Sequence, residues 1–315
     1  MSTNTTENDE KLEIPDRSLL KAAIISMRPQ QWVKNVFVLA PAFFSMQFLQ
    51  IPILIQSLAA ALLFSFGASA VYLLNDIFDI EKDRNHPVKC KRPIPSGQLP
   101  IKIAWMMCAF LGLGSVSAAT FIDWRFGIAL GSYLTMNLAY STILKHVPFV
   151  DVSIIATGFV LRVLAGSFAI NVLISEWLFV CTFLLALYLG LGKRQHELKL
   201  VMRGEASKVR KVLERYHPEL LEFAFLFVAG ITIACYTVYT LSASLPNQPL
   251  RVTQTPFNSV YLPITIPFTV FGITRFYQLV NKDSPESPTD LLLRDWPFIL
   301  NILGWGGCAI ILVFI

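Results

Sequence analysis

The sequence predicts an all-α integral membrane protein with about nine transmembrane helices, and three observations lead to that prediction. Of the 315 residues, 54% are hydrophobic and only 15% are charged, whereas soluble domains carry roughly 25% charged residues. The charges are clustered, so that long apolar runs alternate with short charged loops. A soluble chain of this size cannot bury so much apolar surface, and the excess must therefore contact lipid.

The spans are predicted from the lengths of the apolar runs, because a helix needs about 20 apolar residues to cross the hydrocarbon layer. Nine segments meet or approach that length. They are 34–50, 52–78, 101–121, 126–144, 150–171, 176–192, 219–243, 259–279 and 297–315. We expect residues 1–25 to form a polar cytoplasmic segment without a signal peptide, and residues 26–315 to form one multi-spanning helical domain.

Lysine and arginine residues are distributed unevenly between the two sides of these spans. With the N-terminus in the cytoplasm, 23 of the 26 lie on the cytoplasmic side, Arg125 and Arg251 lie opposite, and Arg162 lies within the fifth span. Cytoplasmic loops characteristically carry this excess. The sequence therefore predicts a multi-pass protein of the cell (inner) membrane with its N-terminus and active site in the cytoplasm. The net charge of +5 reflects this bias and does not indicate nucleic-acid binding.

The end of the second span carries several acidic and amide side chains, in the sequence Y-L-L-N-D-I-F-D-I-E-K-D-R. On a continuing helix, Tyr72, Asn75, Asp79 and Asp83 form one stripe, and Asp76 lies beside it. A solvated helix end is the simpler interpretation, but acidic residues at a helix C-terminus oppose the helix dipole. Hard oxygen ligands at this spacing suit Mg²⁺. We therefore predict that Asn75, Asp76, Asp79 and Asp83 bind Mg²⁺ and that the three aspartates are catalytic.

A basic, proline-rich loop follows the carboxylates directly, in the sequence H-P-V-K-C-K-R-P-I-P-S-G. Its prolines restrict the backbone, and it presents Lys89, Lys91 and Arg92. A metal ion and cationic side chains together can bind all the oxygens of a diphosphate. These three residues are therefore predicted to bind the substrate, as part of a magnesium–diphosphate site.

A second polar cluster lies at the end of the sixth span, in G-K-R-Q-H-E-L. Lys193, Arg194 and Glu197 are spaced for ion pairs along one helix face, and we predict that they bind substrate. The alternative is that they are ordinary cytoplasmic charges with a helix-stabilising ion pair.

Other polar residues are expected on the same side of the membrane. Lys34, Tyr140 and Lys145 are additional candidates for substrate contacts. Arg162 lies deep in an apolar span and must have a polar partner there, which the sequence does not identify.

The sequences N-D-I-F-D-I-E-K-D-R and H-P-V-K-C-K-R-P-I-P-S-G together resemble the first aspartate-rich motif of the UbiA-type intramembrane prenyltransferase superfamily. The resemblance covers nearly the whole chain. It implies a UbiA-like helical bundle that binds magnesium and a diphosphate donor between two acidic motifs. The second motif departs from the usual D-x-x-x-D, with one carboxylate and two cations. In this second motif, and in the sequences R-P-Q-Q-W-V-K-N and Y-S-T-I-L-K, the chain resembles the decaprenyl-phosphate phosphoribosyltransferase branch of the superfamily.

That branch implies Mg²⁺-dependent transfer of 5-phosphoribose from phosphoribosyl pyrophosphate to a polyprenyl phosphate, with release of pyrophosphate. Lys193 and Arg194 would hold either the ribose 5-phosphate or the acceptor phosphate, and Tyr72, Tyr140 and Lys145 would make other contacts. The alternatives are a UbiA-type aromatic prenyltransferase that uses a prenyl diphosphate, and a membrane transporter, which would place polar residues near the midplane of several spans. The sequence leaves the length of the polyprenyl chain and the formation of an oligomer open.

Overall fold

The computed structural model describes residues 17–45, 47–173, 175–204, 212–243 and 261–314. Over these ranges the regular structure is helical and includes no strand, which confirms the predicted fold class. Most of the predicted polar segment 1–25 lies outside the described residues. Five of the cations used to predict the orientation also lie outside the described residues. They are Lys11, Lys208, Arg210, Lys211 and Arg251.

Five of the described helices are long and apolar enough to cross a membrane. They are α3 (Ile51–Phe78), α5 (Ile101–Ile122), α7 (Val150–Ala169), α8 (Glu176–Met202) and α9 (Pro218–Ala243). Helices α6 (Trp124–Thr142) and α12 (Trp296–Phe314) contain 19 residues each, and α12 is apolar over Trp296–Leu312. Helix α10 (Ile266–Val280) has 15 residues and is therefore only about 22 Å long. The chain is a multi-pass membrane protein, and the number of about nine spans stays a prediction.

The expected first span, 34–50, is wrong as a single helix. The structure has three short helices there instead, η1 (Pro29–Val38), α2 (Ala40–Phe44) and η2 (Gln47–Leu49). Pro41 explains the break, because it has no N–H to donate and its ring collides with the carbonyl four residues earlier. It is accommodated in the first turn of α2, where neither cost arises.

The chain divides into two compact units. The described part of unit 1 comprises residues 17–33 and 66–115. It contains α1 (Leu19–Met27), the last part of α3, α4 (Ile80–Arg84), η3 (Lys89–Lys91) and the first part of α5. Its core consists of small and aliphatic side chains from α1, α3, α5 and the proline-rich loop. They are Ala22, Leu73, Ile77, Ile94, Leu99 and Ala104.

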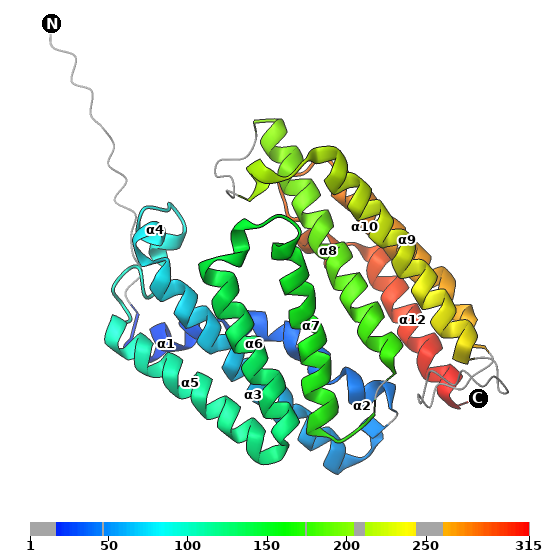
Figure 1. Cartoon of the computed structure of the whole chain (residues 1–315), viewed down its shortest axis with the longest axis horizontal. Helices are drawn as coiled ribbons and strands as arrows, with labels where there is room; N and C mark the ends of the chain where they lie inside the picture. The colour runs from blue at the N-terminus through cyan, green and yellow to red at the C-terminus, as the bar shows by residue number, and fades with distance from the viewer. Residues whose placement is uncertain (1–16, 46, 174, 205–211, 244–260, 315) are drawn as a thin grey trace, which may run out of the picture. The chain divides into compact units, whose positions relative to one another are not determined.

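The described part of unit 2 comprises residues 34–45, 47–65, 116–173, 175–204, 212–243 and 261–314. Helix α7 packs against both α6 and α8, α8 packs against α9, and α10 packs against α9 and α12 (Figure 1). The core between α8, α9 and α10 is aromatic, because the ring of Tyr188 stacks on Phe225 at 4.7 Å and meets the edge of Phe276 at 5.3 Å. Four short helices connect the long ones, η4 (Leu144–His146), η5 (Leu213–Arg215), η6 (Leu262–Thr265) and α11 (Pro288–Leu292).

Candidate active site

The aspartates predicted to bind metal lie where α3 ends and α4 begins, within unit 1. Asp79 separates the two helices, but the helical hydrogen bonds continue across it. The Asp79 N–H donates to the Asn75 carbonyl (2.9 Å), and the Asp83 N–H donates to the Asp79 carbonyl (2.8 Å). Asp76 and Asp83 are seven residues apart, which is two helical turns, so they lie on the same side. Both are buried, whereas Asn75 and Asp79 are half-buried.

Two arginines and a lysine converge on these buried carboxylates. Arg92 donates from a single nitrogen, Nη1, to Asp76 Oδ1 (3.0 Å) and to Asp83 Oδ2 (2.7 Å). Arg28 Nη2 donates to the same Asp76 Oδ1 at 2.5 Å. Lys89 Nζ lies 3.7 Å from Asp83 Oδ1. We call these five residues the aspartate–arginine cluster.

The basic loop positions Arg92 by folding tightly beside the cluster. Arg92 ends the η3 turn with extended backbone (φ −67°, ψ 149°), and its carbonyl accepts a hydrogen bond from the Ser96 N–H (3.0 Å). Ile94 and Leu99 anchor the same loop in the core of unit 1. Lys91 contributes its backbone carbonyl, which accepts a bond from Arg17 at 3.4 Å.

Arg28 belongs to the cluster although the sequence analysis does not name it. It caps the C-terminus of α1 in the left-handed conformation (φ 53°, ψ 60°), which non-glycine residues rarely adopt. This conformation lets the chain turn into Pro29 while the guanidinium lies over the ring of Tyr72, 5.1 Å from its centroid. The signal that could have identified Arg28 is the R-P pair in R-P-Q-Q-W-V-K-N.

The cluster fits a divalent cation by its donor chemistry. The described residues contain no site where three acidic, histidine or cysteine side chains already converge on one point. However, the carboxylates of Asp76 and Asp83 already share one positively charged nitrogen, Arg92 Nη1. A cation that replaced that nitrogen would meet two oxygen ligands, and such ligands suit Mg²⁺.

In unit 2, Arg194 on α8 is held by two carboxylates. Its Nε donates to Asp151 Oδ2 (2.7 Å) and its Nη1 to Glu197 Oε2 (2.6 Å). Tyr216 donates to the other Asp151 oxygen at 2.6 Å and accepts from the Phe149 N–H at 2.7 Å. We call these five residues the Arg194 network. Because the Arg194 side chain is only 3% exposed, its geometry favours an organising role over the predicted contact with a phosphate.

The remaining predicted residues of unit 2 lie on four different segments. Lys193 is half-buried on α8, next to Arg194, and Tyr140 on α6 lies close enough to interact electrostatically with Arg194. Lys145 is half-buried in η4, and Lys34 is exposed on η1. Because Lys193 is more exposed than Arg194, it is the better candidate of the two for binding a phosphate. Sequence reasoning missed Tyr216, and no local pattern marks it.

Arg162 finds its partners among neutral groups within unit 2. It donates to Asn35 Oδ1 (2.8 Å), to the Gly158 carbonyl (2.7 Å) and to the Tyr133 hydroxyl (3.0 Å). Its guanidinium also lies between 4.8 and 5.3 Å from the centroids of three aromatic rings, Phe64, Tyr133 and Phe159. These contacts tie η1 to α6 and α7 in a region where a bare charge would be costly.

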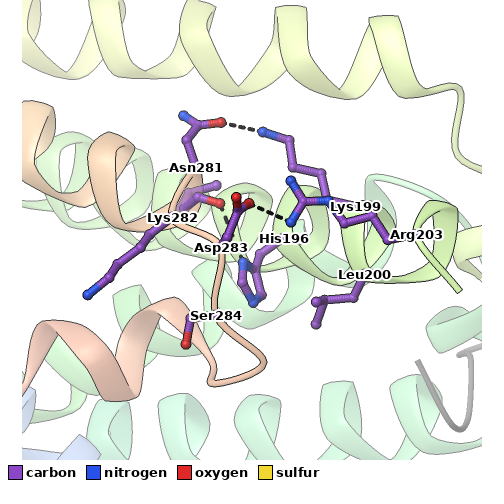
Figure 2. A pocket seen from close by; sticks show the side chains of 9 residues that line it. His196, Lys199, Leu200, Arg203, Asn281, Lys282, Asp283 and Ser284 are labelled. Atoms are coloured by element: carbon purple, nitrogen blue, oxygen red, sulfur yellow. Dashed lines mark hydrogen bonds and ion pairs between the residues drawn. The ribbon is translucent and has the colours of Figure 1, made fainter. Parts of the chain in front are cut away.

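A shallow pocket lies at the end of α8, beside the loop that follows α10 (Figure 2). Arg203 pairs with Asp283 at 2.5 Å, and Lys199 hydrogen-bonds Asn281. His196 Nδ1 lies 3.4 Å from the Val280 carbonyl. These contacts hold the loop against α8, which is a structural role.

Comparison with known proteins identifies relatives of nearly full length. The chain is 32% identical to the decaprenyl-phosphate phosphoribosyltransferase of Corynebacterium glutamicum, over 99% of this chain and 92% of that protein. It is 30% identical to the protein of the same name from Mycolicibacterium smegmatis, over 97% and 96% of the two chains.

Solved structures share the fold. A UbiA homolog from Archaeoglobus fulgidus bound to GPP and Mg²⁺ superposes with a TM-score of 0.66 at 16% identity, over 93% of this chain and all of that one. The same homolog bound to DMAPP and Mg²⁺ gives a TM-score of 0.65 at 17% identity, over 93% and 99% of the two chains. The family model described as "UbiA prenyltransferase family" matches residues 36–302. With its aspartate–arginine cluster, its helical membrane fold and these relatives, the chain belongs to the UbiA prenyltransferase family of membrane transferases.

Proposed function

We propose that this chain transfers the 5-phosphoribosyl group of phosphoribosyl pyrophosphate to a polyprenyl phosphate and releases pyrophosphate. The observation that carries the proposal is the similarity, over nearly the full length, to the two bacterial proteins named decaprenyl-phosphate phosphoribosyltransferase. The aspartate–arginine cluster supports the part of the reaction that involves the diphosphate, because it offers both carboxylates and cations.

In the reaction, the bond between ribose C1 and the diphosphate oxygen breaks, and its electron pair leaves with the diphosphate. A new bond forms between C1 and an oxygen of the lipid phosphate. That phosphate is already an anion near neutral pH, so the step needs no strong general base. Negative charge builds on the leaving diphosphate, and Arg28, Lys89 and Arg92, which surround Asp76 and Asp83, would stabilise it.

Magnesium would be held by Asp76 and Asp83 with Asn75 and Asp79, which lie on the same three turns. When bound, it would act as a Lewis acid on the diphosphate. In unit 2, we propose that Lys193 binds a second phosphate, helped by Tyr140, Lys145 and Lys34. The Arg194 network would fix the backbone on which Lys193 lies.

Transfer of a prenyl group is the second candidate. It is favoured by the solved structures of the same fold, in which the Archaeoglobus fulgidus homolog is bound to GPP or DMAPP with Mg²⁺. The transporter alternative has less support, because the matched family is one of transferases. Both transfer reactions need the same diphosphate chemistry, so the donor has to be determined by assay.

We also propose that the active site faces the cytoplasm of the cell (inner) membrane. Lys82, Arg84, Lys89, Lys91 and Arg92 all lie between Phe78, where α3 ends, and α5. Basic residues flanking spans are retained on the cytoplasmic side, where a phosphorylated sugar donor is available.

The proposal is tested by a transfer assay on the full chain in nanodiscs. Labelled phosphoribosyl pyrophosphate, a polyprenyl phosphate and Mg²⁺ are supplied, and label is measured in the lipid phase. We expect transfer that a chelator abolishes and that Asp79→Asn lowers about 100-fold or more. Glu81→Gln is the matched control, because Glu81 is an exposed acid on α4, and it should keep full activity.

Two results would contradict this function. The first is the absence of label in lipid together with turnover of a prenyl diphosphate, which would support the second candidate. The second is transfer that persists in the presence of the chelator, which would remove magnesium from the reaction.

A further inference from the structure

The two carboxylates of the aspartate–arginine cluster are paired with cationic side chains of the protein itself. Asp76 and Asp83 contribute two negative charges, and Arg28, Lys89 and Arg92 contribute three positive ones. Arg92 Nη1 lies within 3.0 Å of both carboxylates. A metal ion that bridged the two carboxylates would have to occupy the position of this nitrogen.

The acidic and basic partners differ in how easily they can move. The Asp76 and Asp83 side chains are short, are 4% and 2% exposed, and lie two helical turns apart on a continuous run of helical hydrogen bonds. The Arg28 and Arg92 side chains are 28% and 32% exposed, and arginine has a long, flexible stem. The carboxylates are therefore fixed, and the guanidinium groups are the parts that can leave.

We infer that Arg28 and Arg92 form a cationic latch that exchanges for the metal only when a diphosphate binds at the same time. This inference rests on the proposed function, because it concerns the same site. A divalent cation alone must displace two guanidinium groups and leave them without their carboxylates. A diphosphate that arrives with the metal gives both guanidinium groups and Lys89 new anionic partners.

The latch predicts strong coupling between the two ligands. The metal should bind weakly on its own, and the diphosphate should raise its affinity. By thermodynamic linkage, the metal should raise the affinity for the diphosphate by the same factor. The function of such a device would be to keep the site from binding free metal in the absence of the donor.

The first experiment uses the wild-type chain in nanodiscs and needs no variant. Mn²⁺ binding is titrated by electron paramagnetic resonance, with and without methylenediphosphonate, a diphosphate that cannot be cleaved. We expect the diphosphonate to tighten Mn²⁺ binding at least about tenfold, within the usual range of coupling between two sites. Equal Mn²⁺ affinity in its presence and absence would overturn the latch.

The second experiment removes the latch. In Arg92→Gln, two buried carboxylates lose their shared cation, so Mn²⁺ alone should bind about tenfold more tightly than to wild type, and the diphosphonate should enhance binding less. Arg84→Gln is the matched control, because Arg84 lies near the same loop but contacts Glu81 and the Pro95 carbonyl. It should bind like wild type.

Thermal unfolding of each variant separates a lost fold from a lost latch. A folded Arg92→Gln protein that binds Mn²⁺ no better than wild type would overturn the inference. Failure of the proposed function gives a different result, because the coupling would persist while phosphoribosyl transfer failed. Failure of the latch alone would leave transfer intact and abolish the coupling.

Discussion

At the scale of single residues, the structure changes the role of Arg194. The sequence presents Lys193 and Arg194 as equivalent cations, but only Arg194 lies between Asp151 and Glu197. A buried guanidinium with two carboxylate partners is costly to separate from them. Arg194 therefore organises the start of α7 and the end of α8, and we propose that Lys193, which is half-buried on α8, contacts the substrate.

Tyr216→Phe tests this organising role. The substitution removes the hydroxyl that donates to Asp151 and accepts from the Phe149 N–H. Because both groups would lose a buried partner, we expect a loss of about 1–3 kcal/mol in the free energy of unfolding, measured by thermal and denaturant unfolding in nanodiscs.

Tyr277→Phe is the control for that experiment, because the ring of Tyr277 stacks on Phe225 and is unchanged by the loss of its hydroxyl. If Tyr216→Phe were as stable as this control, the network would have no organising role.

Burial also raises the pKa of Tyr216, and its hydrogen bond to Asp151 acts in the same direction. The phenol therefore stays protonated across the physiological range and continues to donate. The hydrogen bond from Tyr216 to Asp151 is therefore kept throughout this range.

At the scale of elements, one ion pair joins α10 to the start of α12. Arg275 donates to both oxygens of Asp295, from Nε at 3.0 Å and from Nη2 at 2.7 Å. Asp295 also accepts a bond from the Phe298 N–H at 3.0 Å, as an N-terminal capping residue does. It therefore connects the two helices and caps one of them.

The Asp295 connection should depend on pH. The hydrogen bond from Arg275 lowers the pKa of Asp295 below its ordinary value of 3.8. The stabilisation is therefore complete above that value and is lost as pH falls through the lowered pKa. Asp295→Ala should cost about 1 kcal/mol at neutral pH and less in acid, as measured by unfolding at a series of pH values.

A pH-independent difference between Asp295→Ala and wild type would contradict the role of ionisation. Asp290→Ala is a suitable control, because it removes a similar acid from the neighbouring α11 and leaves the pair between Arg275 and Asp295 intact.

The boundaries of the helices are where prediction from the sequence fails. A run of apolar residues over 34–50 predicts a span, yet Pro41 and its neighbours form three short helices. The α8 helix extends beyond the predicted end at 192 to Met202, so that the second polar cluster lies on the helix itself. Hydropathy identifies apolar segments well, but it does not determine whether backbone hydrogen bonding continues through them.

At the scale of the whole molecule, the orientation in the membrane is the property most open to test. Cys90 lies in the basic loop beside the aspartate–arginine cluster. The other four cysteines lie in α5, α8, α9 and α12 and can be replaced by alanine. A membrane-impermeant maleimide should then label Cys90 in inside-out vesicles and not in intact spheroplasts.

Trp124→Cys, in a chain without Cys90, gives the matched control, because Trp124 is exposed at the start of α6, on the side predicted to be opposite. The maleimide should label this cysteine in intact spheroplasts and not in inside-out vesicles. Labelling of Cys90 in intact spheroplasts would place the active site on the outer face and contradict the proposed cytoplasmic donor.

The sequence by itself determined the membrane class, the helical fold, the family and the two polar clusters. These follow from composition, apolar run length and local motifs, which are properties of neighbouring residues. Only the tertiary structure decided which charges meet. Arg28 is 48 residues from Asp76, Tyr216 is 65 residues from Asp151 and Asn35 is 127 residues from Arg162. Such pairs form because buried charges and polar groups must find partners when water is excluded, and the fold chooses those partners from distant parts of the chain.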